Sequence, residues 1–318
     1  MTEARAPVLI PHDHGITAVD AEYGWLGQSA AHVVVRDGRA LVVDSGTAHA
    51  VPRLLAALER LGVAREAVDY LFVTHVHLDH AGGAGALLAR LPRARAVLHP
   101  RGAPHLIDPA KLIAGTKAVY GEAAYARLYG EILPLPAERI VITQDGDRLT
   151  LGASSFEIWH TPGHALHHHV LVDPAARAIF SGDTFGVSYR EFDTARGAWV
   201  LATCTPTQFD PEQLRASIRR IVAWRPAAVY LMHYSRVGNA EALAAEQLAQ
   251  IDAFVAMAER HRTDPARHAA LRAAMLELWR ARLRAHGCRL DDARIDELLE
   301  LDLELNVQGL EAWLERRR

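Results

Sequence analysis

Cysteine, lysine and net charge are all scarce in this chain of 318 residues. Its two cysteines, Cys204 and Cys288, are too few for a disulfide framework and lie in no Cys-x-x-Cys pattern, which predicts a reducing compartment. Only Lys111 and Lys117 are lysines. Thirty-five basic residues against 38 acidic ones leave a net charge of -3, so bulk charge argues against a nucleic-acid partner.

Long apolar runs are also missing. No stretch approaches the ~20 apolar residues that a membrane-spanning helix needs. A secretory signal combines a basic start with a long apolar core. Residues 1–11 lack this combination. We therefore expect no membrane association, a cytoplasmic location and a small-molecule substrate rather than a macromolecular partner.

Histidine, in contrast, is abundant, with 18 residues, and it is the commonest metal ligand in proteins. The apolar run 70–74 is followed within six positions by His75, His77, Asp79 and His80. The carboxyl end of a strand is where α/β sheets build their sites. Alternate residues of such a turn can project to a common side. His75 and His77 could thus hold one ion, while Asp79 and His80 turn toward a second.

Three later segments repeat this setting. Each is an apolar, strand-length run that leads into a single metal-competent side chain. His164 stands in the turn Thr-Pro-Gly-His, Asp183 in Ser-Gly-Asp-Thr, and His233 directly after its strand. One such residue alone is typical of a structural role. Three in this order, after the His-x-His-x-Asp-His motif, predict a metal site.

Short β-branched runs bounded by Gly, Asp and Pro alternate with helical periods, and this alternation predicts an α/β sandwich. The expected strands cover 31–35, 40–43, 70–73, 96–98, 156–159, 169–172, 178–180 and 228–232. The expected helices cover 51–61, 84–91 and 211–224, with Asp210 as the N-cap of the last.

The composition changes at residue 240. Three stretches rich in Ala, Leu, Arg and Glu, at 241–261, 265–286 and 291–317, have helical periodicity and no strand signal. We therefore predict a catalytic domain over 1–239 and a helical extension over 240–318. The leucines and Trp313 of the last stretch make it too apolar to lie free in water. It walls the active site, forms the interface of a homodimer, or fills out one side of the core.

Taken in order, these motifs resemble those of the metallo-β-lactamase fold hydrolases, over about residues 8 to 239. The resemblance implies a four-layer αβ/βα sandwich. It also implies that Asp44 supports the metal loop, and that His168 matches a second histidine found after Thr-Pro-Gly-His in glyoxalase II-like members. The ligands that the resemblance implies are His75, His77 and His164 for one metal, Asp79, His80 and His233 for the other, and Asp183 as the bridge.

The resemblance further implies two divalent metal ions. This donor set suits Zn²⁺, with Fe or Mn as alternatives at the oxygen-richer position. Two such ions lower the pKa of a bridging water toward ~7 and clamp the developing oxyanion. The expected nucleophile is then a hydroxide, and Asp79 is our choice for orienting it and carrying its proton to the leaving group.

The substrate is harder to predict than the reaction. Asp183 and His80 differ from the patterns of the β-lactamases, and only Ser235-Arg236 follows His233 where glyoxalase II proper has basic residues for glutathione. The chain is most similar to glyoxalase II-like hydrolases with a helical tail. We expect cleavage of an ester, lactone or thioester, with β-lactams and S-lactoylglutathione as poorer substrates than small neutral esters.

Two alternatives stay open at this point. One is a persulfide dioxygenase of the same fold, with a single iron held by His75, His164 and Asp183. The other is a non-enzymatic member with a vestigial site, which is disfavoured because no ligand position is missing.

Overall fold

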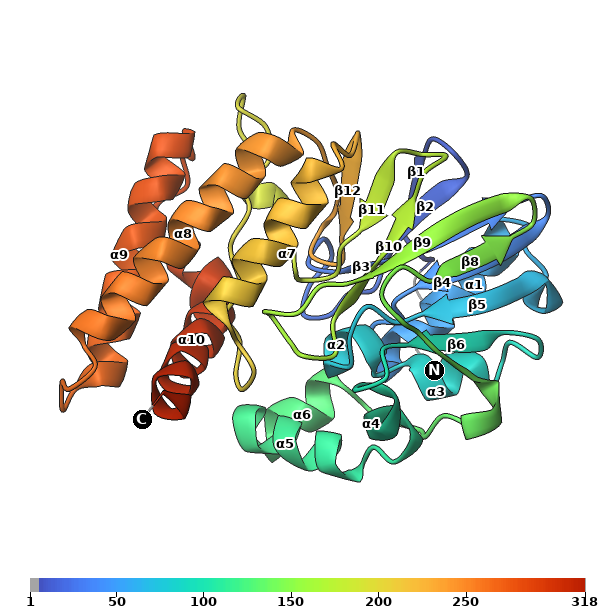
Figure 1. Ribbon diagram of the computed structural model, residues 1–318, viewed down its shortest axis with the longest axis horizontal. Helices are drawn as coiled ribbons and strands as arrows, with labels where there is room; N and C mark the ends of the chain where they lie inside the picture. The colour runs from blue at the N-terminus through green and yellow to red at the C-terminus, as the bar shows by residue number, and fades with distance from the viewer. Residues whose placement is uncertain (1–5, 318) are drawn as a thin grey trace. The chain divides into compact units, whose positions relative to one another are not determined.

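The computed structural model describes residues 6–317. Its first sheet has seven strands in the order β1-β2-β3-β4-β5-β6-β7 (Figure 1). Strands β1 to β4 pair antiparallel, and β4 to β7 pair parallel. Their bounds are β1 Leu9–His12, β2 Ile16–Asp20, β3 Ala30–Arg36, β4 Arg39–Val43, β5 Val68–Phe72, β6 Arg95–Leu98 and β7 Ile140–Ile142.

The second sheet has six strands in the order β13-β12-β11-β10-β9-β8. Strands β8 to β11 pair antiparallel. Their bounds are β8 Arg148–Leu151, β9 Ser154–His160, β10 His169–Asp173, β11 Ala178–Phe180, β12 Ala228–Leu231 and β13 Ser235–Val237. The eight strands predicted from the sequence are all present, each within one or two residues of its expected ends.

The helices are α1 Val51–Arg60, α2 Leu78–Ala81, α3 Ala84–Leu88, α4 Ala103–Ile107, α5 Ala110–Tyr120, α6 Glu122–Leu128, α7 Pro211–Ala223, α8 Ala240–Arg260, α9 Arg267–His286 and α10 Asp292–Arg316. Short 3₁₀ helices lie at Ala48–Ala50, Arg65–Ala67, Ala137–Arg139 and Arg190–Phe192. Asp210 caps α7 as predicted, accepting a hydrogen bond from the Gln213 backbone N–H at 3.0 Å. No helix within residues 6–317 has the length and apolar character needed to cross a membrane.

Buried apolar side chains hold the helices against the first sheet. Apolar side chains of α1 and α3, such as Leu54 and Leu87, are buried in one cluster with side chains of β3 to β6. Between the two sheets, the Phe72 ring stacks on His169 with ring centroids 4.4 Å apart. The predicted α/β sandwich with a C-terminal helical region is therefore confirmed.

The chain divides into two compact units. One contains residues up to 160 together with 167–182 and 232–235, and the other contains 161–166, 183–231 and the chain from 236 onward. The second unit thus combines α7 and the segments around it with the C-terminal helices. The division at 239/240 that the composition predicts stays a prediction about folding units.

The C-terminal helices have a core of their own. Trp279 of α9 is fully buried and packs edge-on against Phe254 of α8, with ring centroids 6.1 Å apart. On α10, Leu298, Leu303 and Trp313 are buried. Within residues 6–317 the large hydrophobic side chains that remain exposed lie elsewhere, at Val8, Ile107, Leu133 and Ile142. The apolar face of α10 is therefore covered within this chain, which favours the core-filling alternative.

Candidate metal centre

The His-x-His-x-Asp-His motif changes conformation in its middle. His75 and His77 lie in the loop after β5, whereas Asp79 and His80 lie on the single turn of α2. The His80 backbone N–H donates to the His77 carbonyl oxygen at 3.0 Å, so the helix begins inside the motif rather than after its glycines. The first pair of side chains therefore leaves an extended loop, while the second pair leaves a helix.

The carboxylate of Asp44 holds this loop through hydrogen bonds. Asp44 follows β4, which is the parallel neighbour of β5, so the carboxyl ends of the two strands are adjacent. Its carboxylate accepts hydrogen bonds from the Thr74 backbone N–H at 2.8 Å, from Thr74 Oγ1 at 2.9 Å and from His80 Nδ1 at 2.9 Å. Asp44 thus lies where a residue that supports the metal loop must lie.

His233 follows β12 and meets the motif at Asp79. Its Nδ1 donates to the Gln28 carbonyl oxygen at 2.9 Å, and its Nε2 lies 3.2 Å from Asp79 Oδ2. His80 Nε2 lies 3.6 Å from the same carboxylate oxygen. Ligand atoms of Asp79, His80 and His233 are all within 4.8 Å of one another, as the geometry of a metal site requires.

His164 and Asp183 are joined through Thr203. The Thr203 hydroxyl donates its one proton to the Asp183 carbonyl oxygen at 3.1 Å, and it therefore accepts a hydrogen bond from His164 Nδ1 at 2.9 Å. His164 Nε2 lies 3.7 Å from Asp183 Oδ2. One hydroxyl thus fixes both the ring of one predicted ligand and the backbone of the other.

The same pattern holds for His80, His164 and His233. In each ring Nδ1 meets a protein oxygen, from Asp44, Thr203 and Gln28 respectively. This contact places the proton on Nδ1 and leaves Nε2 as the nitrogen that can bind a metal. In each ring Nε2 also faces a carboxylate oxygen of the cluster. The donor set therefore fits divalent metal ions.

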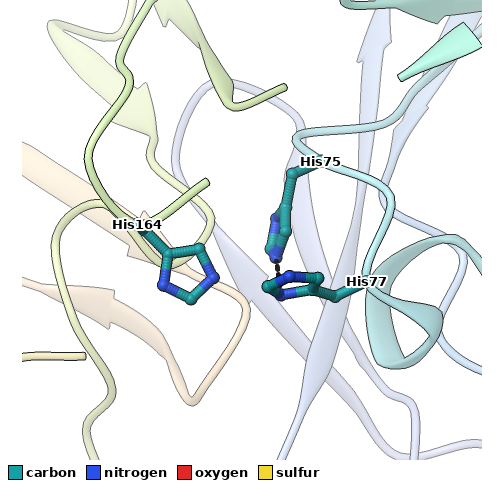
Figure 2. Close-up of side chains that lie close together, drawn as sticks. All are labelled: His75, His77 and His164. Atoms are coloured by element: carbon teal, nitrogen blue, oxygen red, sulfur yellow. Dashed lines mark hydrogen bonds between the residues drawn. The ribbon is translucent and has the colours of Figure 1, made fainter. Parts of the chain in front are cut away.

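His75 and His77 face each other instead. His75 Nε2 and His77 Nδ1 are 2.9 Å apart (Figure 2). Both residues belong to the first compact unit, together with Asp79, His80 and His233. Five of the seven ligands predicted from the sequence thus lie in the first unit, and His164 and Asp183 lie in the second.

His168 is fully buried behind this cluster. Its ring stacks on His75 with centroids 4.8 Å apart. Gly182, which precedes Asp183, has a φ of +47°, and a Cβ there would come within 2.7 Å of both His168 Nε2 and Thr74 Oγ1. Glycine is therefore required for this close approach. His168 thus contacts the predicted ligand His75, and its role in supporting the ligands stays a prediction.

Tyr189 and Cys204 have structural partners on α10. Tyr189 donates to Asp302 of α10 at 2.8 Å, and the Cys204 backbone N–H donates to Asn306 Oδ1 at 2.5 Å. The role of Thr203 was missed because its contact with His164 depends on tertiary structure. Gln28 was missed because it acts through a backbone carbonyl, which no side-chain pattern reveals.

Comparison with known proteins agrees with this geometry. Residues 24–233 match the family model of the metallo-beta-lactamase superfamily, and the chain belongs to this superfamily. A hydroxyacylglutathione hydrolase of Aeromonas hydrophila is 29% identical over 226 residues, which are 70% of this chain and 65% of that protein. The match thus spans just under two thirds of that relative's length. The expected membership of a glyoxalase II-like branch is confirmed.

Two further relatives are informative. A hydroxyacylglutathione hydrolase of Pseudomonas aeruginosa is 30% identical over 227 residues, covering 70% of this chain and 66% of that protein. The crystal structure of an archaeal metallo-beta-lactamase superfamily protein from Sulfolobus tokodaii has a TM-score of 0.67 at 20% identity. That match covers 94% of this chain and 99% of the archaeal one. At this identity the structural likeness shows the fold alone.

Proposed function

We propose that this protein is a dinuclear metal-dependent hydrolase that cleaves an ester, a lactone or a thioester. The observation that carries the proposal is the fixed orientation of His80, His164 and His233, whose Nε2 atoms all face carboxylate oxygens. Imidazole rings held in this way by a hydrogen bond at Nδ1 are typical of metal centres. Histidines with purely structural roles have no reason to direct Nε2 toward a carboxylate oxygen.

The assignment of ligands is the one that the resemblance to the superfamily implies. One ion would be held by His75, His77 and His164 and the other by Asp79, His80 and His233, with Asp183 as the bridge. Zn²⁺ is the metal proposed, with Fe or Mn as alternatives. When bound, two such ions would supply Lewis-acid activation of water and of the substrate carbonyl.

Asp79 is the residue of this chain proposed to move the proton. Its side chain is 18% exposed, whereas that of the neighbouring His80 is fully buried. A substrate can therefore approach Asp79. Its Oδ2 lies between His80 Nε2 and His233 Nε2, so a carboxylate oxygen is held where it can take a proton from the attacking water and pass it to the leaving group.

The substrate class is supported by two different observations. The relatives named hydroxyacylglutathione hydrolase support a thioester. Arg236 is the one basic residue in the stretch 234–259 that follows His233, which supports a small neutral ester or lactone because an anionic substrate needs a cationic clamp. A homodimer and a cytoplasmic location stay predictions, and light scattering of the purified protein tests the first of them.

The test combines metal analysis with a substrate screen. Metal-reconstituted protein should bind about two ions per chain. His75→Ala and Asp183→Ala should lower metal content and turnover together, whereas His268→Ala should change neither because His268 lies on α9 among glutamates. The screen covers esters, lactones, thioesters, β-lactams and glutathione persulfide, with an oxygen electrode attached.

A single bound ion under metal-replete conditions would contradict the dinuclear assignment. Oxygen consumption on the persulfide, with no hydrolysis of the other compounds, would favour the mononuclear iron dioxygenase instead.

A further inference from the structure

We propose that the hydroxyl of Tyr23 is a hydrogen-bond donor to a substrate oxygen beside Asp79 and His233, and thus a further catalytic residue. The inference rests on the proposed hydrolase function and deepens it. Tyr23 belongs to none of the sequence motifs of the site, and it comes from a different segment of the chain.

The loop that carries Tyr23 is held firmly. Asp20, at the end of β2, accepts hydrogen bonds from the Glu22 backbone N–H at 2.8 Å and from the Gly27 backbone N–H at 2.7 Å. Gln28 follows directly and binds His233 Nδ1 through its carbonyl oxygen. One short loop therefore fixes both His233 and Tyr23.

Tyr23 borders the predicted ligands. Its ring meets the His233 ring edge-on, with centroids 6.4 Å apart and an interplanar angle of 64°. His233 in turn lies 3.2 Å from Asp79. Tyr23 is 7% exposed, so it packs firmly against its neighbours while retaining some accessible surface.

The hydroxyl of Tyr23 has a partner that orients it. Tyr23 Oη and Tyr129 Oη are 2.6 Å apart, and Tyr129 is 1% exposed. The Tyr129 ring packs against Tyr120 and Tyr125, with centroids 5.4 Å and 5.6 Å away. This tyrosine cluster, formed by Tyr23, Tyr120, Tyr125 and Tyr129, connects the segment of α5 and α6 to the metal centre.

Proton counting gives the hydroxyl its role. The ordinary pKa of a tyrosine hydroxyl is about 10. The hydroxyls of Tyr23, Tyr120 and Tyr129 therefore keep their protons at neutral pH. Tyr129 also hydrogen-bonds Tyr120, so two hydrogen bonds use two of the three protons that these hydroxyls carry. The negative charge of Asp79 favours the order in which Tyr120 donates to Tyr129 and Tyr129 donates to Tyr23, because the third proton then points from Tyr23 toward the site.

A neutral donor at this place suits acyl transfer. The carbonyl oxygen of an ester or thioester gains negative charge in the transition state, and a hydrogen bond to it strengthens as the charge develops. The Tyr23 hydroxyl should therefore act mainly on kcat and less on KM. It adds no positive charge, which agrees with a neutral substrate.

The test compares matched Tyr-to-Phe variants of the full chain after metal loading. Tyr23→Phe keeps the ring and removes the hydroxyl, and it should lower kcat for 4-nitrophenyl acetate by about 10- to 100-fold at unchanged metal content. Tyr125→Phe is the control, since it makes the same change within the tyrosine cluster but away from His233. It should stay within about twofold of the parent protein.

A second readout does not depend on turnover. Acetate, as a product analogue, should perturb the visible spectrum of the Co²⁺-loaded protein, and Tyr23→Phe should weaken acetate binding by about fivefold or more. Tyr129→Phe leaves the Tyr23 hydroxyl without its orienting partner and should have an intermediate effect, which keeps the test valid if Tyr23→Phe folds poorly.

Unchanged kcat and unchanged acetate binding in Tyr23→Phe would overturn the proposal, as would a Tyr125→Phe effect of equal size. If the parent protein hydrolyses no ester, the proposed function fails. Acetate binding by the Co²⁺ form still decides the role of Tyr23 in that case, and the absence of any acetate effect on the parent spectrum counts against it.

Discussion

Two networks of polar side chains differ sharply in their surroundings. Around the metal centre, the His80 and Asp44 side chains are 0% and 3% exposed. A row of ion pairs joins α9 to α10 and is called the ladder below. It includes Arg272 with Glu300, whose side chains are 27% and 64% exposed. Both networks have short hydrogen bonds. The number of polar contacts therefore says little about what each network contributes.

Burial decides the difference. A buried donor that loses its acceptor cannot turn to water, and the full desolvation cost of that group then falls on the folded state. An exposed arginine that loses its glutamate is simply hydrated again. We therefore expect substitutions at the metal centre to have effects several times larger than substitutions in the ladder.

The largest effect is expected at Asp44. Asp44→Ala removes the acceptor of His80 Nδ1 and of the Thr74 backbone N–H, both of which are buried. It should lower the free energy of unfolding by about 3–5 kcal/mol and metal affinity by about 10- to 100-fold. Urea unfolding and metal titration measure these changes. Asp69→Ala, which removes a half-exposed partner of Arg39, is the control. Equal losses in the two variants would remove the contrast between buried and exposed networks.

Acid should separate buried histidines of the first compact unit from the ladder by sign. Burial lowers the pKa of His32 and of His169 to about 3, and burial together with His160 and Arg101 lowers that of His99 to about 4, from an ordinary value of 6.5. The unfolded chain binds protons at these positions below about pH 6.5, while the folded chain does not. Stability should therefore fall by up to about 1.4 kcal/mol per pH unit for each histidine as the pH drops below that value.

The histidine of the ladder should behave in the opposite way. Hydrogen bonding to Glu311, together with the charge of Glu304, raises the pKa of His268. Its contribution is thus present at low pH and is lost as the pH rises through its folded pKa. Urea unfolding at several pH values should show a shallower slope below about pH 6.5 in His32→Gln. His268→Gln should instead lose the fall in stability that the parent protein shows as the pH rises above about 6.5. Parallel slopes for both variants and the parent would contradict this assignment.

A smaller effect is expected where α10 meets the metal centre. A Cβ at Gly309 would overlap the Cys204 carbonyl oxygen, next to Thr203. Gly309→Ala should therefore cost about 1–3 kcal/mol through overpacking and weaken metal binding severalfold through the displaced Thr203 hydroxyl. Gly115→Ala on α5 has open space around its Cβ and should leave metal binding unchanged. Metal titration of both variants provides the measurement. Unaltered metal affinity in Gly309→Ala would mean that the packing of α10 does not affect metal binding.

The smallest effect is expected within the ladder. Arg272→Ala removes hydrogen bonds to Glu300 and Glu304, at 2.8 Å and 2.6 Å, from partly exposed side chains. It should change the free energy of unfolding by about 0.2–1 kcal/mol, with a smaller change at high salt. Urea unfolding at low and high ionic strength measures both. A salt-independent loss above this range would mean that the ladder is coupled to the core of the helices.

The sequence predicted those parts of the molecule that have a local signal. Alternating apolar runs marked the strands, and an aspartate before a proline marked the start of α7. Helix α5 has no buried residue, so its sequence lacks the apolar stripe that marks a helix packed on a core. For this reason α5 was not predicted. The start of α2 inside the ligand motif was also missed, because four residues are too few for a helical period.

The candidate site divides in the same way. His75, His80 and Asp183 follow strands and could be found from their order in the chain. Tyr23 and Thr203 could not, because each matters only through a neighbour far away in sequence: His233 for Tyr23 and His164 for Thr203. Such contacts are set by tertiary packing, which a single sequence does not display.

The spread of the ligands along the chain also determines an order of assembly. Asp44, Thr74 and His80 are synthesised early, and their hydrogen bonds need no later residue. The group of Asp79, His80 and His233 cannot be complete on a ribosome-bound chain until His233 has emerged. The contact of Gly309 with the Cys204 backbone must wait for the final helix. A partly synthesised chain therefore carries some of the donor atoms early, but the complete set of ligands becomes available only near the end of translation.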